Sequence, residues 1–184
     1  MIKREFLIIG ITLPDFYPDE AKRINELLYN NEADLIHIRK PYANEEEIEN
    51  LLNKVDPSLH NRLKLHDHFE LLEKYNLGGV HLNSRNNSPH PKARSISKSL
   101  HSLSEIKKDC NYDYFFISPV FDSISKIGYK AAFDLNDISR FIKDTKAVAL
   151  GGITKEKLPL LKSLGFYGAA MTGYFFQKNN LTEI

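Results

Sequence analysis

Two stretches decide the fold: Ala147-Val148-Ala149-Leu150-Gly151-Gly152 and, further along, Gly168-Ala169-Ala170-Met171-Thr172-Gly173. Each is a short apolar run that ends in turn residues, which is typical of a strand buried on both faces. A segment with helical character, residues 155–164, separates them. Strands joined by a helix in this way are the repeating unit of α/β folds with a parallel sheet.

The glycines at these strand ends also indicate a ligand. Glycine lets the backbone approach a ligand closely and direct its N–H groups at an anion. In a (β/α)₈ barrel, the loops after strands 7 and 8 form a phosphate site of this kind. The predicted phosphate-binding residues are Gly151, Gly152, Thr172 and Gly173.

Upstream, six further strand patterns alternate with helical ones. The expected strands are residues 6–12, 34–39, 63–65, 80–82, 94–99 and 112–117. The first expected helix turns Ala21, Ile24, Leu27 and Leu28 inward, and the second is capped by Asn44 and Glu47. Further helices are expected at residues 69–75, after a capping box at residues 102–105, and at residues 135–142. We predict a compact (β/α)₈ barrel, one domain over residues 1–184. Its last helix is abbreviated, because about 200 to 250 residues is usual for this fold.

The amino-acid composition limits the classes of binding partner that we expect. Basic and acidic residues nearly balance, 25 against 24, whereas a nucleic-acid-binding domain usually has a basic surplus. The single cysteine, Cys110, excludes an intramolecular disulfide and fits a reducing cytosol, so we expect a cytoplasmic protein. The apolar run 6–13 ends at Pro14 and is too short for a signal peptide or a membrane span. We expect a small-molecule ligand and no nucleic-acid or membrane partner, and homo-oligomerisation stays open.

Histidines gather at the predicted strand ends, where the active sites of this fold are built. Histidine is the side chain most easily tuned for proton transfer near neutral pH. His37 alternates with Ile36 and Ile38, which directs it into the barrel. His81 lies within an apolar strand, so a hydrogen-bonded core histidine is an alternative to a catalyst. Five of the seven histidines lie at these strand ends: His37, His66, His68, His81 and His101.

The segment His66-Asp67-His68 leaves two further alternatives open. Residues two apart on a strand share a face, so the two histidines could bind a transition metal in a metal-dependent hydrolase. Asp67 could equally cap a helix that begins at His68. Lys40 is most simply a solvated charge. The polar segment 118–133 is long for a loop in a compact domain, and its place after a strand favours a function.

Together these motifs resemble the thiamine phosphate synthase/TenI family of (β/α)₈ barrels, along nearly the whole chain. The order and spacing of several short stretches carry the resemblance. They are residues 36–39, 65–67, 79–82, 99–102, 118–121 with Ser123, Ser125 and Lys126, then residues 150–153 and 168–173.

The resemblance implies one of two activities. The synthase branch joins hydroxymethylpyrimidine diphosphate to a thiazole phosphate and releases pyrophosphate, with Mg²⁺ to stabilise the departing charge. The TenI branch carries out a cofactor-free proton shift that converts a carboxythiazole phosphate into its aromatic tautomer. A binder that kept the phosphate site and lost the chemistry is a third alternative.

Several positions match the synthase branch. Arg39 matches its arginine, Asp67 one of its Mg²⁺-binding aspartates, and Ser99 and Lys126 are kept. Two threonines of the family are replaced, hydroxyl for hydroxyl, by Ser123 and Ser125.

Other positions depart from the synthase. Asn86 stands where the second metal-binding aspartate is expected, and it lacks the charge that a hard cation favours. Pro41 replaces a phosphate-contacting lysine, and it stays open whether the adjacent Lys40 contacts the phosphate in its place. His66 replaces an asparagine and His37 a glutamine, both of which touch substrate in the synthase.

We therefore favour a TenI-like tautomerase without a cofactor over a Mg²⁺-dependent synthase. His101 aligns with the TenI acid/base, although the synthase also has a histidine there. The resemblance implies that His37 orients the ring and that Arg39 or Lys126 holds the carboxylate. Ser99, Ser123 and Ser125 complete the expected substrate-binding set, and Asp67 binds metal only in a synthase.

Overall fold

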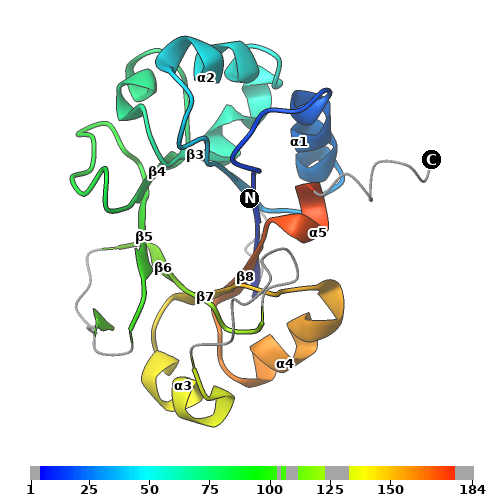
Figure 1. Cartoon of the computed structure of the whole chain (residues 1–184), viewed down its shortest axis with the longest axis vertical. Helices are drawn as coiled ribbons and strands as arrows, with labels where there is room; N and C mark the ends of the chain where they lie inside the picture. The colour runs from blue at the N-terminus through cyan, green and yellow to red at the C-terminus, as the bar shows by residue number, and fades with distance from the viewer. Residues whose placement is uncertain (1–4, 103–104, 107–111, 123–132, 177–184) are drawn as a thin grey trace.

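The computed structural model describes residues 5–102, 105–106, 112–122 and 133–176. Eight parallel strands close into a barrel in chain order (Figure 1). The last strand returns to the first, with Ile9 opposite Ala170. The strands are β1 (Leu7–Ile11), β2 (Leu35–Ile38), β3 (Leu63–Leu65), β4 (Gly79–Leu82), β5 (Ile96–Leu100), β6 (Tyr114–Ile117), β7 (Ala147–Leu150) and β8 (Gly168–Met171).

Helices follow most of the strands on the outside of the barrel, so the predicted fold is confirmed, although the segment between β4 and β5 forms a loop without a helix (Figure 1). No helix in the described part of the chain is long and apolar enough to cross a bilayer. The α-helices are α1 (Glu20–Tyr29), α2 (Glu45–Leu52), α3 (Leu135–Ile142), α4 (Leu158–Ser163) and α5 (Gly173–Phe176). The 3₁₀ helices are η1 (Pro57–Arg62), η2 (Phe69–Glu73) and η4 (Lys155–Lys157).

Local sequence signals account for most element bounds. The Asn44 side chain accepts from the Glu47 N–H, and the Glu47 carboxylate accepts from the Asn44 N–H, the predicted capping box. The predicted helix at residues 155–164 begins as a 3₁₀ turn before α4, and the predicted helix at 69–75 is the 3₁₀ helix η2. Most of the helix predicted behind Ser102 lies outside the described residues.

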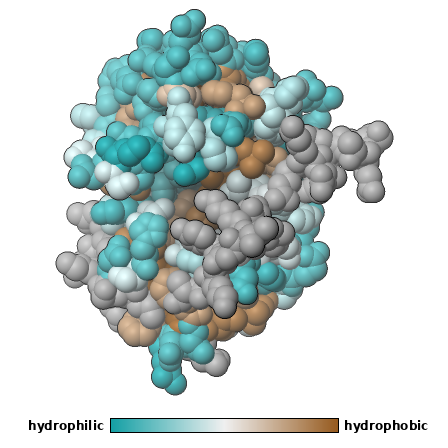
Figure 2. Space-filling view, in the orientation of Figure 1, coloured by the Kyte–Doolittle hydropathy of each residue, from teal (hydrophilic) through white to brown (hydrophobic). Residues whose placement is uncertain are grey.

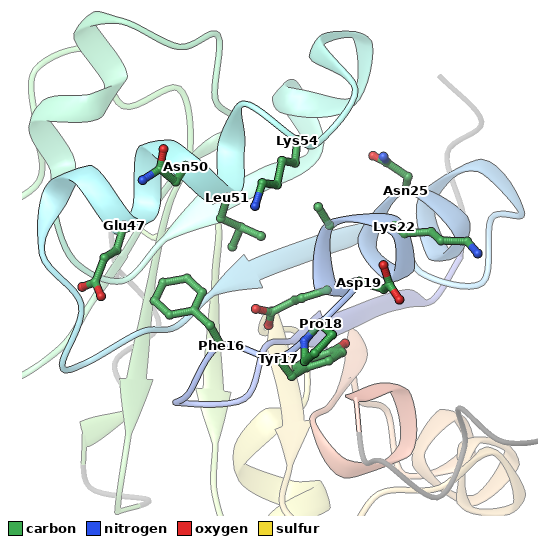
Figure 3. A pocket seen from close by; sticks show the side chains of 12 residues that line it. Phe16, Tyr17, Pro18, Asp19, Lys22, Asn25, Glu47, Asn50, Leu51 and Lys54 are labelled. Atoms are coloured by element: carbon green, nitrogen blue, oxygen red, sulfur yellow. The ribbon is translucent and has the colours of Figure 1, made fainter.

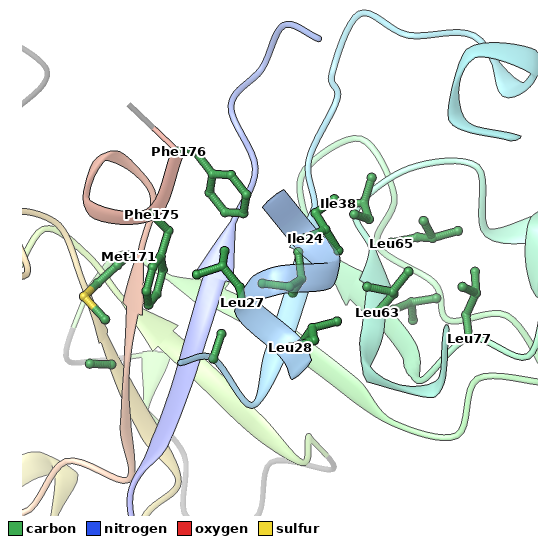
Figure 4. Packing of buried hydrophobic residues seen from close by; sticks show 14 of the residues in the cluster. Ile24, Leu27, Leu28, Ile38, Leu63, Leu65, Leu77, Met171, Phe175 and Phe176 are labelled. Carbon is green, nitrogen blue, oxygen red and sulfur yellow. The ribbon is translucent and has the colours of Figure 1, made fainter. Parts of the chain in front are cut away.

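The main core lies between the barrel wall and the helices. Ile24, Leu27 and Leu28 of α1 are fully buried and lie against the strands, as Figure 4 shows. Leucine-to-alanine changes at such positions typically cost about 2 to 5 kcal/mol. On the outside, hydrophilic residues cover the surface around α2 (Figure 2), whose inner face buries Ile48 and Leu52.

The barrel interior has an apolar side and a polar side. Strands β1, β7 and β8 contribute an apolar cluster that includes Ile9, Val148 and Ala170. Strands β2 to β5 contribute buried polar side chains instead. These are His37, Lys64, His66, His81 and Ser97. Because buried polar groups need partners, this polar side has to form an internal hydrogen-bond network.

Candidate active site at the barrel mouth

Eight of the predicted site residues lie at the barrel mouth, the rim formed by the carboxyl ends of the strands. Arg39 directly follows β2, Asp67 follows β3 by one residue, and His101 directly follows β5. Parallel neighbouring strands bring these ends together although the residues are far apart in the sequence. The described mouth residues are Arg39, Asp67, Ser99, His101, Gly151, Gly152, Thr172 and Gly173, whereas Ser123, Ser125 and Lys126 lie outside the described residues.

The loop after β7 requires its two glycines. Gly151 and Gly152 have φ angles of 99° and 62°, in the left-handed region. A Cβ atom on Gly152 would lie 2.2 Å from the backbone oxygen of Asp122, so this loop packs tightly on the loop after β6. The Val120 N–H donates to the Leu150 carbonyl at 2.9 Å and fixes that contact.

The loop after β8 leads directly into α5. The Thr172 carbonyl accepts from the N–H groups of Phe175 and Phe176, at 3.2 and 3.0 Å, so the helix begins immediately after the strand. Thr172 and Gly173 are half-buried. Phosphate binding by this turn and the preceding one stays a prediction.

Lys40 does not reach the mouth. Its ammonium group is buried, donates to both Glu20 carboxylate oxygens at 2.7 and 2.8 Å, and also donates to the carbonyls of Leu13 and Asp15. Burial lowers its pKa, and Glu20 opposes that shift. The interpretation of Lys40 as a solvated charge is therefore wrong, and it does not replace the lysine missing at Pro41.

The position of the expected Mg²⁺ site is occupied by an ion pair. Asp67 accepts from Arg85 at two atoms, from Nε at 3.1 Å and from an Nη at 3.0 Å. The Asn86 side-chain nitrogen donates to Asp67 Oδ1 at 2.8 Å, so Asn86 turns its amide N–H₂ and not its oxygen toward the carboxylate. A divalent cation here would lie beside a guanidinium group. These residues do not fit a Mg²⁺ ion.

The segment His66-Asp67-His68 does not form a metal cluster of its own. His68 has a left-handed backbone and its Nε2 lies 2.8 Å from the Ala43 carbonyl, away from the barrel interior. Neither Asp67 nor His68 caps η2 through its side chain, because Asp67 is held by Arg85 and Asn86. Both sequence alternatives for this segment are therefore wrong.

His37 lies inside the barrel, as its alternation with Ile36 and Ile38 predicts. Its Nδ1 is 2.9 Å from His66 Nε2, and its Nε2 is 2.6 Å from the Tyr114 hydroxyl. Burial holds the pKa of the His37 ring well below its usual value, so the ring is neutral at pH 7. With both nitrogens engaged and no exposed surface, its contact with a substrate ring stays a prediction.

His81 is a hydrogen-bonded core histidine. Its Nδ1 lies 3.0 Å from Ser97 Oγ and its Nε2 lies 2.9 Å from Ser99 Oγ. Burial lowers the pKa of His81 to about 3, so the ring stays neutral and cannot act as a base near neutral pH. Ser99 is half-buried at the mouth, and His81 fixes its hydroxyl there.

Two polar residues of this region, Arg85 and Lys64, were not predicted from the sequence. Arg85 lies in a turn-rich segment where nothing marks it as the partner of Asp67. Lys64 stands between Leu63 and Leu65, and that alternation was an available signal for an inward lysine. Its ammonium donates to Ser95 Oγ at 2.7 Å and lies 4.3 Å from the centre of the Tyr114 ring.

A surface cavity of about 680 Å³ lies away from these residues, between α1 and α2 (Figure 3). Phe16 and Tyr17 from the loop before α1 line it together with Leu51 and Lys54. It includes none of the predicted site residues. The fold and the mouth together define the class: a (β/α)₈ barrel with polar side chains and glycine turns around one opening.

Known proteins of this class resemble the chain over most of its length. The sequence model of the family described as thiamine monophosphate synthase (TMP-TENI) matches residues 8–174. The chain belongs to this family, which confirms the predicted resemblance and the predicted class of a thiamine-biosynthesis enzyme.

Individual relatives agree with this assignment. A thiamine phosphate pyrophosphorylase from Bacteroides thetaiotaomicron is 36% identical, with a TM-score of 0.79 over 91% of this chain and 83% of that one. A thiamine-phosphate synthase of Bacteroides fragilis (strain YCH46) is 26% identical over 80% of this chain and 81% of its own length. One from Syntrophomonas wolfei is 27% identical over 74% and 72%. These names favour the synthase alternative over the tautomerase.

Proposed function

We propose that the chain acts on a thiazole phosphate as a metal-independent tautomerase. The observation that carries this proposal is the pairing of Asp67 with Arg85 and Asn86, which puts a guanidinium where a diphosphate-transferring site needs Mg²⁺. A proton shift within one substrate molecule needs no such ion, because no diphosphate leaves.

The proposed roles follow the layout of the mouth. The phosphate lies on the backbone N–H groups of Gly151, Gly152, Thr172 and Gly173. His101, exposed at the end of β5, moves the proton between the ring and the exocyclic carbon. Arg39 holds the carboxylate, with Lys126 as the alternative. A single acid/base group of this kind typically contributes about 10²- to 10⁴-fold in rate.

The test is conversion of the carboxythiazole phosphate tautomer, followed by NMR in the presence of a chelator. We expect turnover by the parent chain and a loss of about 10²-fold or more in His101→Gln, with phosphate-ligand binding by calorimetry nearly unchanged. His90→Gln, a histidine outside the mouth, is the matched control and should keep the parent rate. Parent-like conversion by His101→Gln would remove His101 as the acid/base.

The synthase is a second candidate, and the names of the relatives favour it. It requires formation of thiamine phosphate from the two half-substrates, measured with and without Mg²⁺. Synthase turnover by the parent chain would overturn the tautomerase proposal. Ligand binding with neither activity would identify a non-catalytic binder.

A further inference from the structure

Three imidazole rings from three neighbouring strands meet inside the barrel, directly below the mouth. His37 lies on β2, His66 directly follows β3, and His81 lies on β4. One ring nitrogen of each lies within 4.8 Å of the other two. The rings of His66 and His81 stack with centroids 4.3 Å apart, and His37 stands edge-on to both.

This cluster has the chemistry of a nitrogen-ligand metal site. All three rings are buried and neutral, and neutral imidazole is the form that binds a metal. His37 has an outer partner at its second nitrogen, the Tyr114 hydroxyl. His81 has a serine hydroxyl at each nitrogen, Ser97 Oγ and Ser99 Oγ, so it exchanges one of these partners for the metal and keeps the other. Hydrogen bonds of this kind fix ring orientation and tautomer in metal sites.

We propose that His37, His66 and His81 bind one divalent transition-metal ion of the zinc type, with an open position facing the mouth. Three histidines and one open position form a known type of zinc coordination. Of the three residues, only His66 lies beyond the end of its strand, on the side of the mouth, and it is 5% exposed. The site is separate from the Asp67–Arg85 pair and goes beyond the proposed proton shift, which uses no metal.

The present spacing requires one small movement and one larger one. Bonds of about 2.0 to 2.1 Å to Zn²⁺ hold two ligand nitrogens about 3.3 Å apart in a tetrahedral site. His37 Nδ1 and His66 Nε2 lie 2.9 Å apart, so they need to separate by only a few tenths of an ångström. His81 moves furthest, since its ring stacks on His66 and has to turn its nitrogen toward the other two.

The ligand atoms make the site selective. Lys64, Arg39 and Arg85 all act on His66 as positive neighbours, and their charge opposes every divalent cation, so the nitrogen ligands have to outweigh it. A hard cation that depends on anionic oxygen ligands gains nothing here, whereas a borderline-soft metal gains three bonds to nitrogen. We therefore expect Zn²⁺ and Co²⁺ to bind and Mg²⁺ and Ca²⁺ not to bind.

The experiment is titration of the full chain with Co²⁺, followed by its visible absorption bands, and then displacement by Zn²⁺. We expect one ion per chain, an intense spectrum of a four-coordinate site, and three imidazole ligands by X-ray absorption. His66→Asn should weaken Co²⁺ binding by tenfold or more. His68→Asn, two residues away but outside the cluster, is the matched control and should bind as the parent does.

Two measurements keep the outcome independent of folding. Circular dichroism checks each variant, and His37→Gln provides a second disruption of the cluster on a different strand. The parent chain alone is decisive: no Co²⁺ spectrum, or a spectrum with fewer than three imidazole ligands, overturns the proposal. Equal losses in His68→Asn and His66→Asn would also overturn it.

Discussion

A buried lysine inside the barrel makes the stability of the protein depend on pH. Lys64 is 1% exposed, and burial lowers its pKa to about 7, with Asp113 opposing that shift. The unfolded chain holds this proton up to a pKa of about 10.4. Between these two values the unfolded state binds more protons, so the free energy of unfolding rises with pH.

Replacing this lysine should remove that dependence. In Lys64→Met, we expect the free energy of unfolding to rise less steeply between pH 7.5 and 9, by up to about 1.4 kcal/mol per pH unit relative to the parent. Urea unfolding of both proteins at the two pH values measures it, and the other titrating groups cancel in the difference. Equal pH dependence of the unfolding free energy in the two proteins would mean that the pKa of Lys64 is not lowered in the folded state.

The sequence predicts single residues well where a local rule decides their position. Alternation directs His37 into the barrel, and the capping box of Asn44 sets the start of α2. Which residues become partners across the fold is less predictable. The Asp67–Arg85 pair depends on the conformation of a loop, and the buried ion pair of Lys40 depends on where α1 packs. Neither follows from spacing along the chain.

At the scale of elements, the glycine turn after β7 is the feature that positions the predicted phosphate site. In Gly152→Ala, the new Cβ would meet the Asp122 carbonyl at 2.2 Å, in addition to adopting an unfavourable φ. Gly165 also has a positive φ, 88°, but nothing lies within 4 Å of a Cβ placed there. The two positions therefore separate backbone strain from steric collision.

We expect Gly165→Ala to cost about 1 to 2 kcal/mol of unfolding free energy and Gly152→Ala clearly more. Only Gly152→Ala should also weaken binding of a phosphate ligand. Chemical denaturation and calorimetry of the two variants measure these effects. Equal losses of stability, with binding intact in both, would show that the loops after β6 and β7 do not depend on this contact.

Strand pairing explains why the histidine cluster could not be foreseen. Leu65 pairs with Val80, so the next residues, His66 and His81, become neighbours across β3 and β4. This register depends on the staggering of the strands around the barrel, and the sequence pattern does not contain it. The sequence therefore predicted which strands form the barrel and that His37 faces inward, but not which inward residues contact one another.

At the scale of the whole molecule, the barrel depends on one seam that joins its first and last strands. Leu7 pairs with Gly168 there, and the Leu7 N–H donates to the Tyr167 carbonyl at 3.0 Å. A Cβ on Gly168 would lie 2.4 Å from the Leu7 backbone oxygen. That close approach is possible only with glycine.

Gly168→Ala should therefore destabilise the closed barrel as a unit, because separating β8 from β1 exposes both the interior and the core under α1. We expect a loss of stability of about 1 to 3 kcal/mol. Unfolding should remain one transition, with far-ultraviolet circular dichroism and tyrosine fluorescence coinciding. A local effect would instead separate the two probes, since the tyrosines are spread around the barrel whereas the seam involves only two strands. Gly165→Ala, which lies before β8 and outside the seam, provides the control for substitution of glycine alone.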